Sequence, residues 1–352
     1  MRLLYGILAL FLSGFAGGAV AQGVDPGDFS LDGLSRIEVP SPFHAADLID
    51  KNGANIHIAH GRLGLPDEPV ATESDLDAFS YGRDKLMPFG PRYFVSLEYS
   101  VSRGSLGGGR VVTTEVTPPN GNGNAGDKFR LYRLFSGRVV GPWKQQDAMD
   151  IGLTPLPSPD ESEIDGLSWP PGTQQPVYFS VSRDTARKQG LDAAAIYYVQ
   201  DPSTGPTFSV YATSAQLGLQ AGSGPAGDNI DALAINDGGL GGTFEPGDIV
   251  YVSLGVGDPT HRLYFPAGAG DGIIQLSPVV QPPVPPGLLP GAIILGPAQL
   301  DLATAPQEDN LDAITAFDPG PCWSERDPPP KDQQAATELR PWCEPSVEEL
   351  VE

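Results

Sequence analysis

The chain has few of the basic residues on which several classes of protein depend. Lysine and arginine together number 21, against 44 aspartates and glutamates, which gives a formal net charge of −23. Such an acidic surface repels nucleic acid and anionic lipid, so we expect no nucleic-acid partner. The charge is compatible with cation binding, but it also keeps an exported protein soluble, and we favour the second interpretation.

Cysteine is also scarce. The chain has 2 cysteines, Cys322 and Cys343, and both lie near the C-terminus. In an exported protein this pair predicts one disulfide, closed around the proline-rich stretch 327–330. A zinc site is not expected, because two cysteines without nearby histidines do not supply four ligands. We therefore expect residues 321–352 to form a proline-rich, disulfide-closed tail.

Long hydrophobic runs are missing beyond the N-terminus. Residues 1–21 combine Arg2, an apolar stretch and the small-x-small sequence Ala19-Val20-Ala21, a pattern typical of a secretory signal peptide. No later segment reaches the roughly 18 uninterrupted apolar residues that a membrane-spanning helix needs. The sequence thus predicts a secreted or periplasmic protein, without a transmembrane segment, whose mature chain begins at Gln22.

The chain lacks a recognisable catalytic motif. It contains no Gly-x-Ser-x-Gly elbow, no His-Glu-x-x-His helix and no phosphate-binding loop. Carboxylate pairs suited to glycoside hydrolysis are too numerous among 44 acids for the sequence to select one. We therefore assign no catalytic residues.

What the chain does contain is a repeated phrase of the form aliphatic-Asp-small-hydrophobic. Its copies are Leu31-Asp32-Gly33-Leu34, Leu76-Asp77-Ala78-Phe79, Ile164-Asp165-Gly166-Leu167, Ile230-Asp231-Ala232-Leu233 and Leu311-Asp312-Ala313-Ile314. A second phrase precedes four of them: Leu63-Gly64-Leu65, Ile151-Gly152-Leu153, Leu217-Gly218-Leu219 and Leu300-Asp301-Leu302. The regular offset between the two phrases predicts a hairpin-like pair of strands with a loop of nearly fixed length.

Two further segments follow the Asp phrase in each complete unit. One is an alternating strand, as in 93–97, 177–181 and 249–253, and the next is a strand at 127–132, 194–198 and 271–276, shortened at 47–49. Tandem units of about four strands predict a small β-propeller within residues 22–320. The alternatives are a β-sandwich and a β-solenoid. We expect four or five blades, a ring closed by the two chain ends, and a short first unit without its alternating strand.

The repeated aspartate permits two interpretations. A residue that recurs in every unit is typical of a scaffold, where the carboxylate accepts backbone N–H bonds and fixes a turn. The other interpretation is a Ca²⁺ site, because two copies gather several oxygen ligands within four residues. Those candidate ligands are Asp228, Asn229 and Asp231, and Asp309, Asn310 and Asp312. Neither segment has the closing Glu of a twelve-residue Ca²⁺ loop.

One copy carries a family resemblance. The phrase from Ser162 to Trp169 resembles the Asp-box of sialidase-type propellers, although Ser162 lies three places before Asp165 and Gly166 directly after it. The resemblance implies no catalytic residue. Three arginines, Arg83, Arg103 and Arg183, interrupt the repeat, and we expect them to pair with the abundant acids rather than to line a carboxylate-binding mouth.

Together these features predict a secreted, non-enzymatic binding or structural repeat protein, with Ca²⁺ as a candidate stabiliser. Its expected partners are extracellular or cell-surface proteins or glycans. The alternative is an exported hydrolase that acts on carbohydrate through carboxylates at the propeller mouth.

Overall fold

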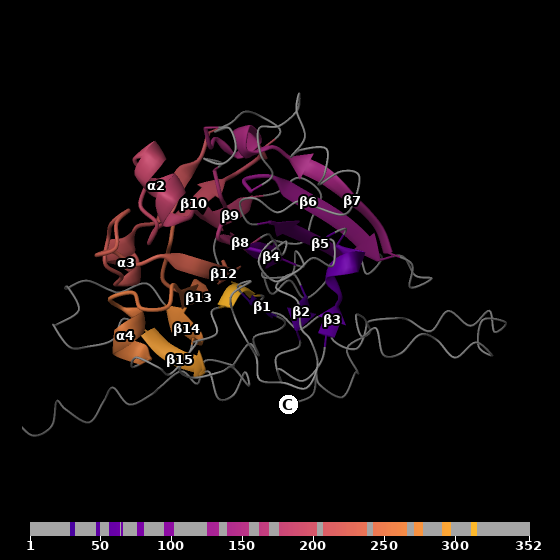
Figure 1. Cartoon of the computed structure of the whole chain (residues 1–352). Coiled ribbons are helices and arrows are strands. Elements are labelled where there is room, and N and C mark those ends of the chain that lie inside the picture. Colours follow the sequence, from indigo (N-terminus) through magenta and orange to yellow (C-terminus); the bar gives the residue numbers. More distant parts are fainter. Residues whose placement is uncertain are drawn as a thin grey trace, which may run out of the picture.

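The chain folds into a four-bladed β-propeller. A computed structural model describes residues 29–31, 47–49, 56–63, 65, 76–80, 95–101, 125–133, 139–154, 162–168, 176–202, 207–237, 242–265, 271–276, 291–296 and 311–314. Within these residues, four antiparallel sheets of four strands surround one axis (Figure 1). The all-β propeller prediction is confirmed with four blades, and the β-sandwich and β-solenoid alternatives are excluded.

Three blades are built from consecutive strands, which follow one another from the innermost position outward. Blade 2 contains β4 (Ala78–Ser80), β5 (Val95–Ser100), β6 (Lys128–Arg133) and β7 (Val139–Gln146). Blade 3 contains β8 (Gly166–Ser168), β9 (Val177–Ser180), β10 (Ile196–Val199) and β11 (Ser209–Ala212). Blade 4 contains β12 (Ile230–Asn236), β13 (Ile249–Leu254), β14 (Ile273–Leu276) and β15 (Gly291–Leu295).

Blade 1 joins the two ends of the chain, as the sequence predicted. Its innermost strand is β16 (Leu311–Ile314), followed outward by β1 (Phe29–Leu31), β2 (Leu48–Ile49) and β3 (Ile56–Ile58). β16 and β1 are antiparallel, with Phe29 opposite Ile314 and Leu31 opposite Leu311. The ring is therefore closed by hydrogen bonds between segments from opposite ends of the described chain.

This closure corrects the interpretation of the first unit. Leu31, which begins the first copy of the Asp phrase, ends the second strand of blade 1 and is not part of an innermost strand. What the first unit lacks is its inner strand, not its second strand. Because β16 occupies the innermost position of blade 1, β1 is the second strand of that blade.

The other four copies of the phrase share one place in the fold. Each lies at the beginning of an innermost strand: β4, β8, β12 or β16. The aliphatic residue before the aspartate is buried in all four copies, and so is the small residue after it (Ala78, Gly166, Ala232 and Ala313). Inner strands crowd around the axis, so this position has little room. A Cβ on Gly166 would lie 2.5 Å from Ser180 Oγ and 2.6 Å from Leu233 Cβ.

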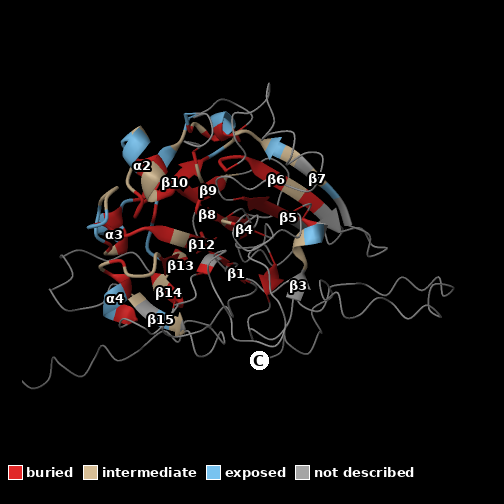
Figure 2. Cartoon of the chain, viewed as in Figure 1, coloured by how far each residue is buried: buried red, intermediate tan, exposed pale blue. Residues whose placement is uncertain are grey.

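Apolar side chains fill each space between neighbouring blades. One buried cluster joins blades 1 and 2, including Leu48, Leu97 and Phe129. Others join blades 2 and 3 through Ala78, Val177 and Phe179, blades 3 and 4 through Ile196, Val250 and Val252, and blades 4 and 1 through Tyr251, Phe29 and Leu311. Figure 2 shows this burial along the strands, with exposed residues on the short helices. Every blade is therefore stabilised by apolar contact on both faces.

The Leu-Gly-Leu phrase was predicted wrongly. In the first three copies, as far as the structure describes them, it is no strand but the end of a one-turn helix that leads from the outer strand of one blade toward the next blade. The fourth copy, Leu300-Asp301-Leu302, lies outside the described residues. The three helices are η1 (His60–Arg62), η2 (Ala148–Ile151) and α3 (Ser214–Leu217). Gly152 and Gly218 follow the last two with φ of 89° and 74°, which glycine adopts without steric strain. The phrase recurs because the same helix end recurs.

A second set of aspartates, unnoticed in the sequence, holds the beginnings of these helices. Each precedes the third strand of its blade and accepts a hydrogen bond from the first helical residue. Asp47 Oδ1 lies 2.7 Å from His60 N, Asp127 Oδ1 lies 3.1 Å from Ala148 N, and Asp192 Oδ2 lies 2.8 Å from Ser214 Oγ. Asp47 and Asp127 thus satisfy backbone N–H groups that a helix terminus leaves without partners, and Asp192 binds a side-chain hydroxyl at the same position.

Two buried serines link one blade to the next. Ser30 Oγ donates to the carbonyl of Leu76 at 3.0 Å, and Ser180 Oγ donates to the carbonyl of Ile230 at 2.9 Å. In both cases a second strand contacts the residue just before the repeated aspartate of the following blade. The serine thus fixes the beginning of the next inner strand.

We expect Gly166→Ala to lower the free energy of unfolding by about 1–3 kcal/mol, because the new methyl group overpacks the contact between blades 3 and 4. Gly224→Ala is the matched control, since a Cβ there has nothing within 4 Å. Urea unfolding of the two variants measures the difference. Equal midpoints would show that the small position of the phrase is not set by packing.

Several sequence predictions fall outside the described residues. They concern the signal peptide at residues 1–21, the Cys322–Cys343 disulfide and the tail at 321–352. Arg83, Arg103, Asp309 and Asn310 also lie outside. No helix in the described part is long and apolar enough to cross a membrane.

Candidate functional site: the acidic mouth of the propeller

The repeated aspartates lie at one end of the propeller. In an antiparallel blade, the start of the inner strand shares an end of the sheet with the connection from the second strand to the third. α2 (Arg183–Gln189) and α4 (His261–Tyr264) occupy that connection in blades 3 and 4. η1, η2 and α3 lie at the same end, because each follows an outer strand. We call this end the helical face; Figure 1 shows α2, α3 and α4 along one side of the sheets.

Within the phrase, the aspartate is the residue nearest to solvent. Ile164 and Ile230 are fully buried, whereas Asp165 is 9% exposed and Asp231 is half-buried. Asp77 is also half-buried, and Asp312 occupies the same position at the beginning of β16. The inner strands contact one another across the axis as well as side by side. Four aspartates therefore stand at the beginnings of the four strands that surround the axis.

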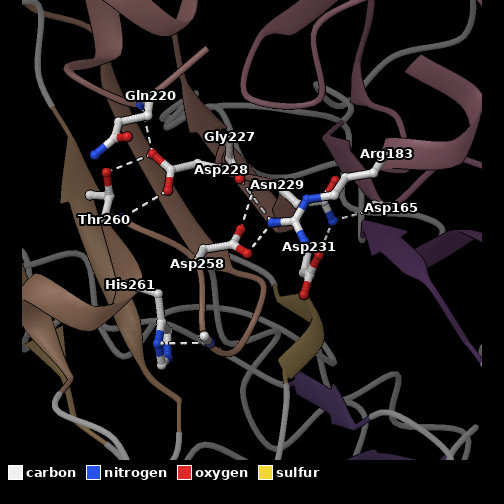
Figure 3. Close-up of polar contacts among 11 residues, drawn as sticks. Asp165, Arg183, Gln220, Gly227, Asp228, Asn229, Asp231, Asp258, Thr260 and His261 are labelled. Carbon is white, nitrogen blue, oxygen red and sulfur yellow. Dashed lines mark hydrogen bonds and ion pairs between the residues drawn. The ribbon is translucent and has the colours of Figure 1, made fainter. Parts of the chain in front are cut away.

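Asn229 brings two of these aspartates together. Its Nδ2 donates to Asp165 Oδ2 at 2.7 Å and also to Asp231 Oδ1 (Figure 3). Asp165 belongs to blade 3, and Asp231 belongs to blade 4. Asn229 itself is 7% exposed. The carboxylates of two neighbouring blades thus share one buried amide.

Arg183 and Asp258 form an ion pair beside this amide. Arg183, the first residue of α2, donates to Asp258 Oδ1 and to the carbonyl of Gly227 at 3.1 Å. Asp258 Oδ2 accepts a hydrogen bond from Asn229 N at 2.6 Å. Arg183 pairs with an acid, as the sequence led us to expect. We call the group of Asp165, Arg183, Asn229, Asp231 and Asp258 the mouth cluster.

Burial dominates the electrostatics of Asp258. Loss of hydration raises the pKa of its carboxyl, while the hydrogen bond and charge of Arg183 and the N–H of Asn229 oppose the rise. Nearby Asp228 raises the pKa further. The raised pKa indicates that burial disfavours the charged form of Asp258 more than the neighbouring guanidinium of Arg183 favours it.

Asp228 points away from the mouth cluster. It is fully buried, and its carboxylate accepts hydrogen bonds from Gln220 N at 2.6 Å, Thr260 N at 2.8 Å and Thr260 Oγ1 at 2.6 Å. Figure 3 shows it directed toward Thr260, whereas Asn229 turns toward Asp165. Asp228 therefore joins two loops of the helical face.

The structure consequently divides the predicted calcium ligands. It brings Asn229 and Asp231 together, but their third neighbour is Asp165 and not Asp228. Among the described residues, no three His, Cys, Asp or Glu side chains form a group suited to a metal ion. Ca²⁺ at the first segment stays a prediction, and Asp309 and Asn310 of the second lie outside the description.

A buried histidine and serine also lie near the helical face. Gly257 N donates to His261 Nδ1 at 3.3 Å, and His261 Nε2 lies 3.5 Å from Asp271 Oδ1. Ser253 Oγ donates to the same aspartate, whose Oδ2 also accepts from Leu311 N at 3.1 Å. The serine contacts the aspartate and not the imidazole, unlike a nucleophile paired with its base. These contacts join blade 4 to the closing strand.

Sequence reasoning overlooked two members of the mouth cluster as ligand candidates. Asp165 belongs to the repeated phrase, so the repeat itself was the available signal, but nothing in the sequence pairs it with Asn229 across two blades. Asp258 lies outside any repeated segment, so the sequence gave no signal for it.

No family model matches the chain, and no curated protein or solved structure shows a significant match.

Proposed function

We propose that this protein is a secreted, non-enzymatic binding protein that uses the helical face of its propeller to hold an extracellular or cell-surface protein or glycan. The observation that carries the proposal is the mouth cluster. Five polar or charged side chains from two blades meet where the connecting loops gather, on a scaffold built from four similar blades. Loops carried by a rigid scaffold are common places for binding.

The hydrogen bonding of the cluster favours binding over catalysis. Asn229 donates to Asp165 and Asp231, and Arg183 donates to Asp258, so these groups hold one another in place. Two of the carboxylates occupy a position that recurs in every blade, which is typical of scaffold residues. A general acid or nucleophile is usually a residue particular to one place in the molecule.

The test compares binding and turnover on the same probes. Purified protein is incubated with chitin, cellulose and a lysine-rich peptide, and both bound protein and released reducing sugar are measured. We expect saturable binding to at least one probe without release of sugar, and we expect Asp231→Asn to weaken that binding at least tenfold. Asp184→Asn is the control, because Asp184 pairs with Arg187 and Lys188 on the surface of α2.

Turnover would contradict the proposal. If the protein released sugar from a probe, and replacement of a single acid abolished the release while the fold was kept, the protein would be a carbohydrate hydrolase. Binding that Asp231→Asn leaves unchanged would place the ligand away from the mouth.

A further inference from the structure

We propose that the mouth cluster is a site for a hard divalent cation, with Ca²⁺ as the best fit, held by Asp165, Asn229 and Asp231. This site goes beyond the proposed binding function and does not depend on the partner. It also differs from the site expected from the sequence, because Asp165 of blade 3 replaces Asp228 as a ligand.

Two carboxylates already converge on one point. Asn229 Nδ2 lies 2.7 Å from Asp165 Oδ2 and also contacts Asp231 Oδ1, so a single atom stands between the carboxylates of two blades. Amide N–H groups and cations both satisfy carboxylate oxygens. These contacts show that positive charge is favoured beside the two carboxylates, and Ca²⁺, which binds oxygen at about 2.3–2.6 Å, would lie next to the amide and not in its place.

The other end of the same amide supplies an independent observation. Asn229 is 93% buried, as its exposed fraction is 7%, and its Oδ1 has no hydrogen-bond partner. A buried polar atom without a partner is unusual and calls for an explanation such as an ion. Because no donor holds Oδ1, the amide can turn by half a rotation and lose only its two Nδ2 contacts. The turn brings Oδ1 beside both carboxylates and completes a set of three oxygens.

Charge at this point also favours a cation. Gly255 lies against the cluster, since a Cβ there would be 3.3 Å from Asp231 Oδ2 and 3.2 Å from Asp258 Oδ2. Together with Asp165, which contacts Nδ2 of Asn229, three carboxylates lie close together, while Arg183 is the guanidinium that pairs with Asp258. Like charges brought together in a poorly hydrated place repel. A divalent cation relieves this repulsion.

The ligand set indicates the class of ion. Carboxylate and amide oxygens suit hard cations, whereas Cu⁺ and Zn²⁺ prefer sulfur or imidazole. Ca²⁺ accepts six to eight oxygens in flexible geometry and takes water where protein ligands are few. With three protein oxygens, water would supply the remaining ligands.

The test is thermal unfolding of the purified protein in chelator and in excess CaCl₂, with calorimetric titration of the metal alone. We expect Ca²⁺ to raise Tm by about 5–10 °C when its free concentration is a hundredfold above Kd. Asp165→Asn and Asp231→Asn should each weaken Ca²⁺ binding at least tenfold. Asp184→Asn should leave the rise unchanged.

Two further variants separate a ligand from a structural residue. Asp228→Asn should lower Tm by the same amount with and without Ca²⁺. The substitution weakens the contacts with Thr260 and Gln220 but does not change the three proposed ligands. Asn229→Asp should lower Tm in chelator, through added repulsion, and bind Ca²⁺ more tightly than the parent chain. It adds a carboxylate without removing an oxygen.

The wild-type measurement decides the proposal even if a variant fails to fold. An unchanged Tm in Ca²⁺, together with no heat of binding, would overturn it. So would a Ca²⁺ response that survives in Asp165→Asn and disappears in Asp228→Asn, because the ion would then lie elsewhere. Neither result affects the binding and turnover test of the proposed function.

Discussion

Replacement of Glu98 with alanine should lower the free energy of unfolding by about 3–5 kcal/mol, because it leaves two buried cations without their shared partner. Glu98 is fully buried in β5. Its carboxylate lies 2.6 Å from Lys128 Nζ and also pairs with Arg130, and the side chains of these cations are 4% and 12% exposed. Both come from β6, where Arg130 stands opposite Glu98.

This ion cluster occupies the face of blade 2 that packs toward blade 3. Ala78 belongs to the apolar cluster shared with blade 3, and Ser80 lies on the same side of β4, opposite Glu98. Charges taken from water in such a place repel strongly when the acid between them is removed. Chemical unfolding in urea at neutral pH measures the loss.

The pH dependence of the variant gives a second readout. Burial lowers the pKa of Lys128 from its ordinary 10.5, while the charge of Glu98 raises it, so Glu98→Ala should lower it further. A lysine with a lower pKa in the folded state binds fewer protons there than in the unfolded state, so stability rises with pH. The deficit of Glu98→Ala should therefore shrink as the pH rises toward 10.5.

Two comparisons make this prediction falsifiable. Glu245→Ala, at an exposed position, should have little effect on stability. Replacement of Glu98, Lys128 and Arg130 together by methionine should restore much of the stability, because no buried charge is then left without a partner. A loss below about 1 kcal/mol for Glu98→Ala, with no change across the pH range, would show that the three charges are hydrated.

Removal of β16 should have the other large effect. A chain that ends at residue 310 lacks Leu311 and Ile314, which are buried between blades 4 and 1, and Ala313, which is buried between blades 1 and 2. It also leaves β1 without its inner partner and opens the ring. We expect this chain to lose its single cooperative thermal transition and to bind a hydrophobic dye.

A chain that ends at residue 320 is the matched control. It keeps β16 and removes the tail predicted at 321–352, so we expect a cooperative transition within a few degrees of the full chain. If both chains unfolded alike and cooperatively, β16 would not be needed to close the propeller. If both lost cooperativity, residues 321–352 would belong to the folded unit.

Much of the fold was predictable because the propeller repeats its own geometry. Each inner strand begins with an aliphatic residue in the core, a polar residue at the mouth and a small residue near the axis. The Asp phrase has these three residue types in this order, so it recurs in every blade. The alternating segments at 177–181 and 249–253 likewise predicted the second strands β9 and β13. Periodicity of side chains is a local property, so a sequence displays it directly.

The Leu-Gly-Leu phrase shows where such local reasoning fails. Two leucines around a glycine suit the end of a helix as well as a strand, and the spacing to the next aspartate does not distinguish them. The structure does, since Leu153 N contacts Ala148 O at 3.0 Å and Leu219 N contacts Ser214 O at 2.8 Å. Both are bonds of a helix end closed by a left-handed glycine.

The candidate site was less predictable because its members come from different blades. Asn229 and Asp231 were identified from their spacing, whereas Asp165 is 64 residues away from Asn229 and meets it only when blades 3 and 4 pack together. Asp228 was expected as a ligand because it is adjacent to Asn229. Its contacts with Thr260 instead depend on a loop that spacing along the sequence does not reveal.

The central feature proposed for this protein is a cation held at the acidic mouth, where the inner strands of a closed four-bladed ring begin. Anomalous scattering from crystals of the protein grown with calcium tests this most directly. We predict one calcium peak between Asp165, Asn229 and Asp231 on the helical face, with the Oδ1 of Asn229 turned toward the ion. Carboxylates of Asp165 and Asp231 that point apart, with no peak between them, would contradict it.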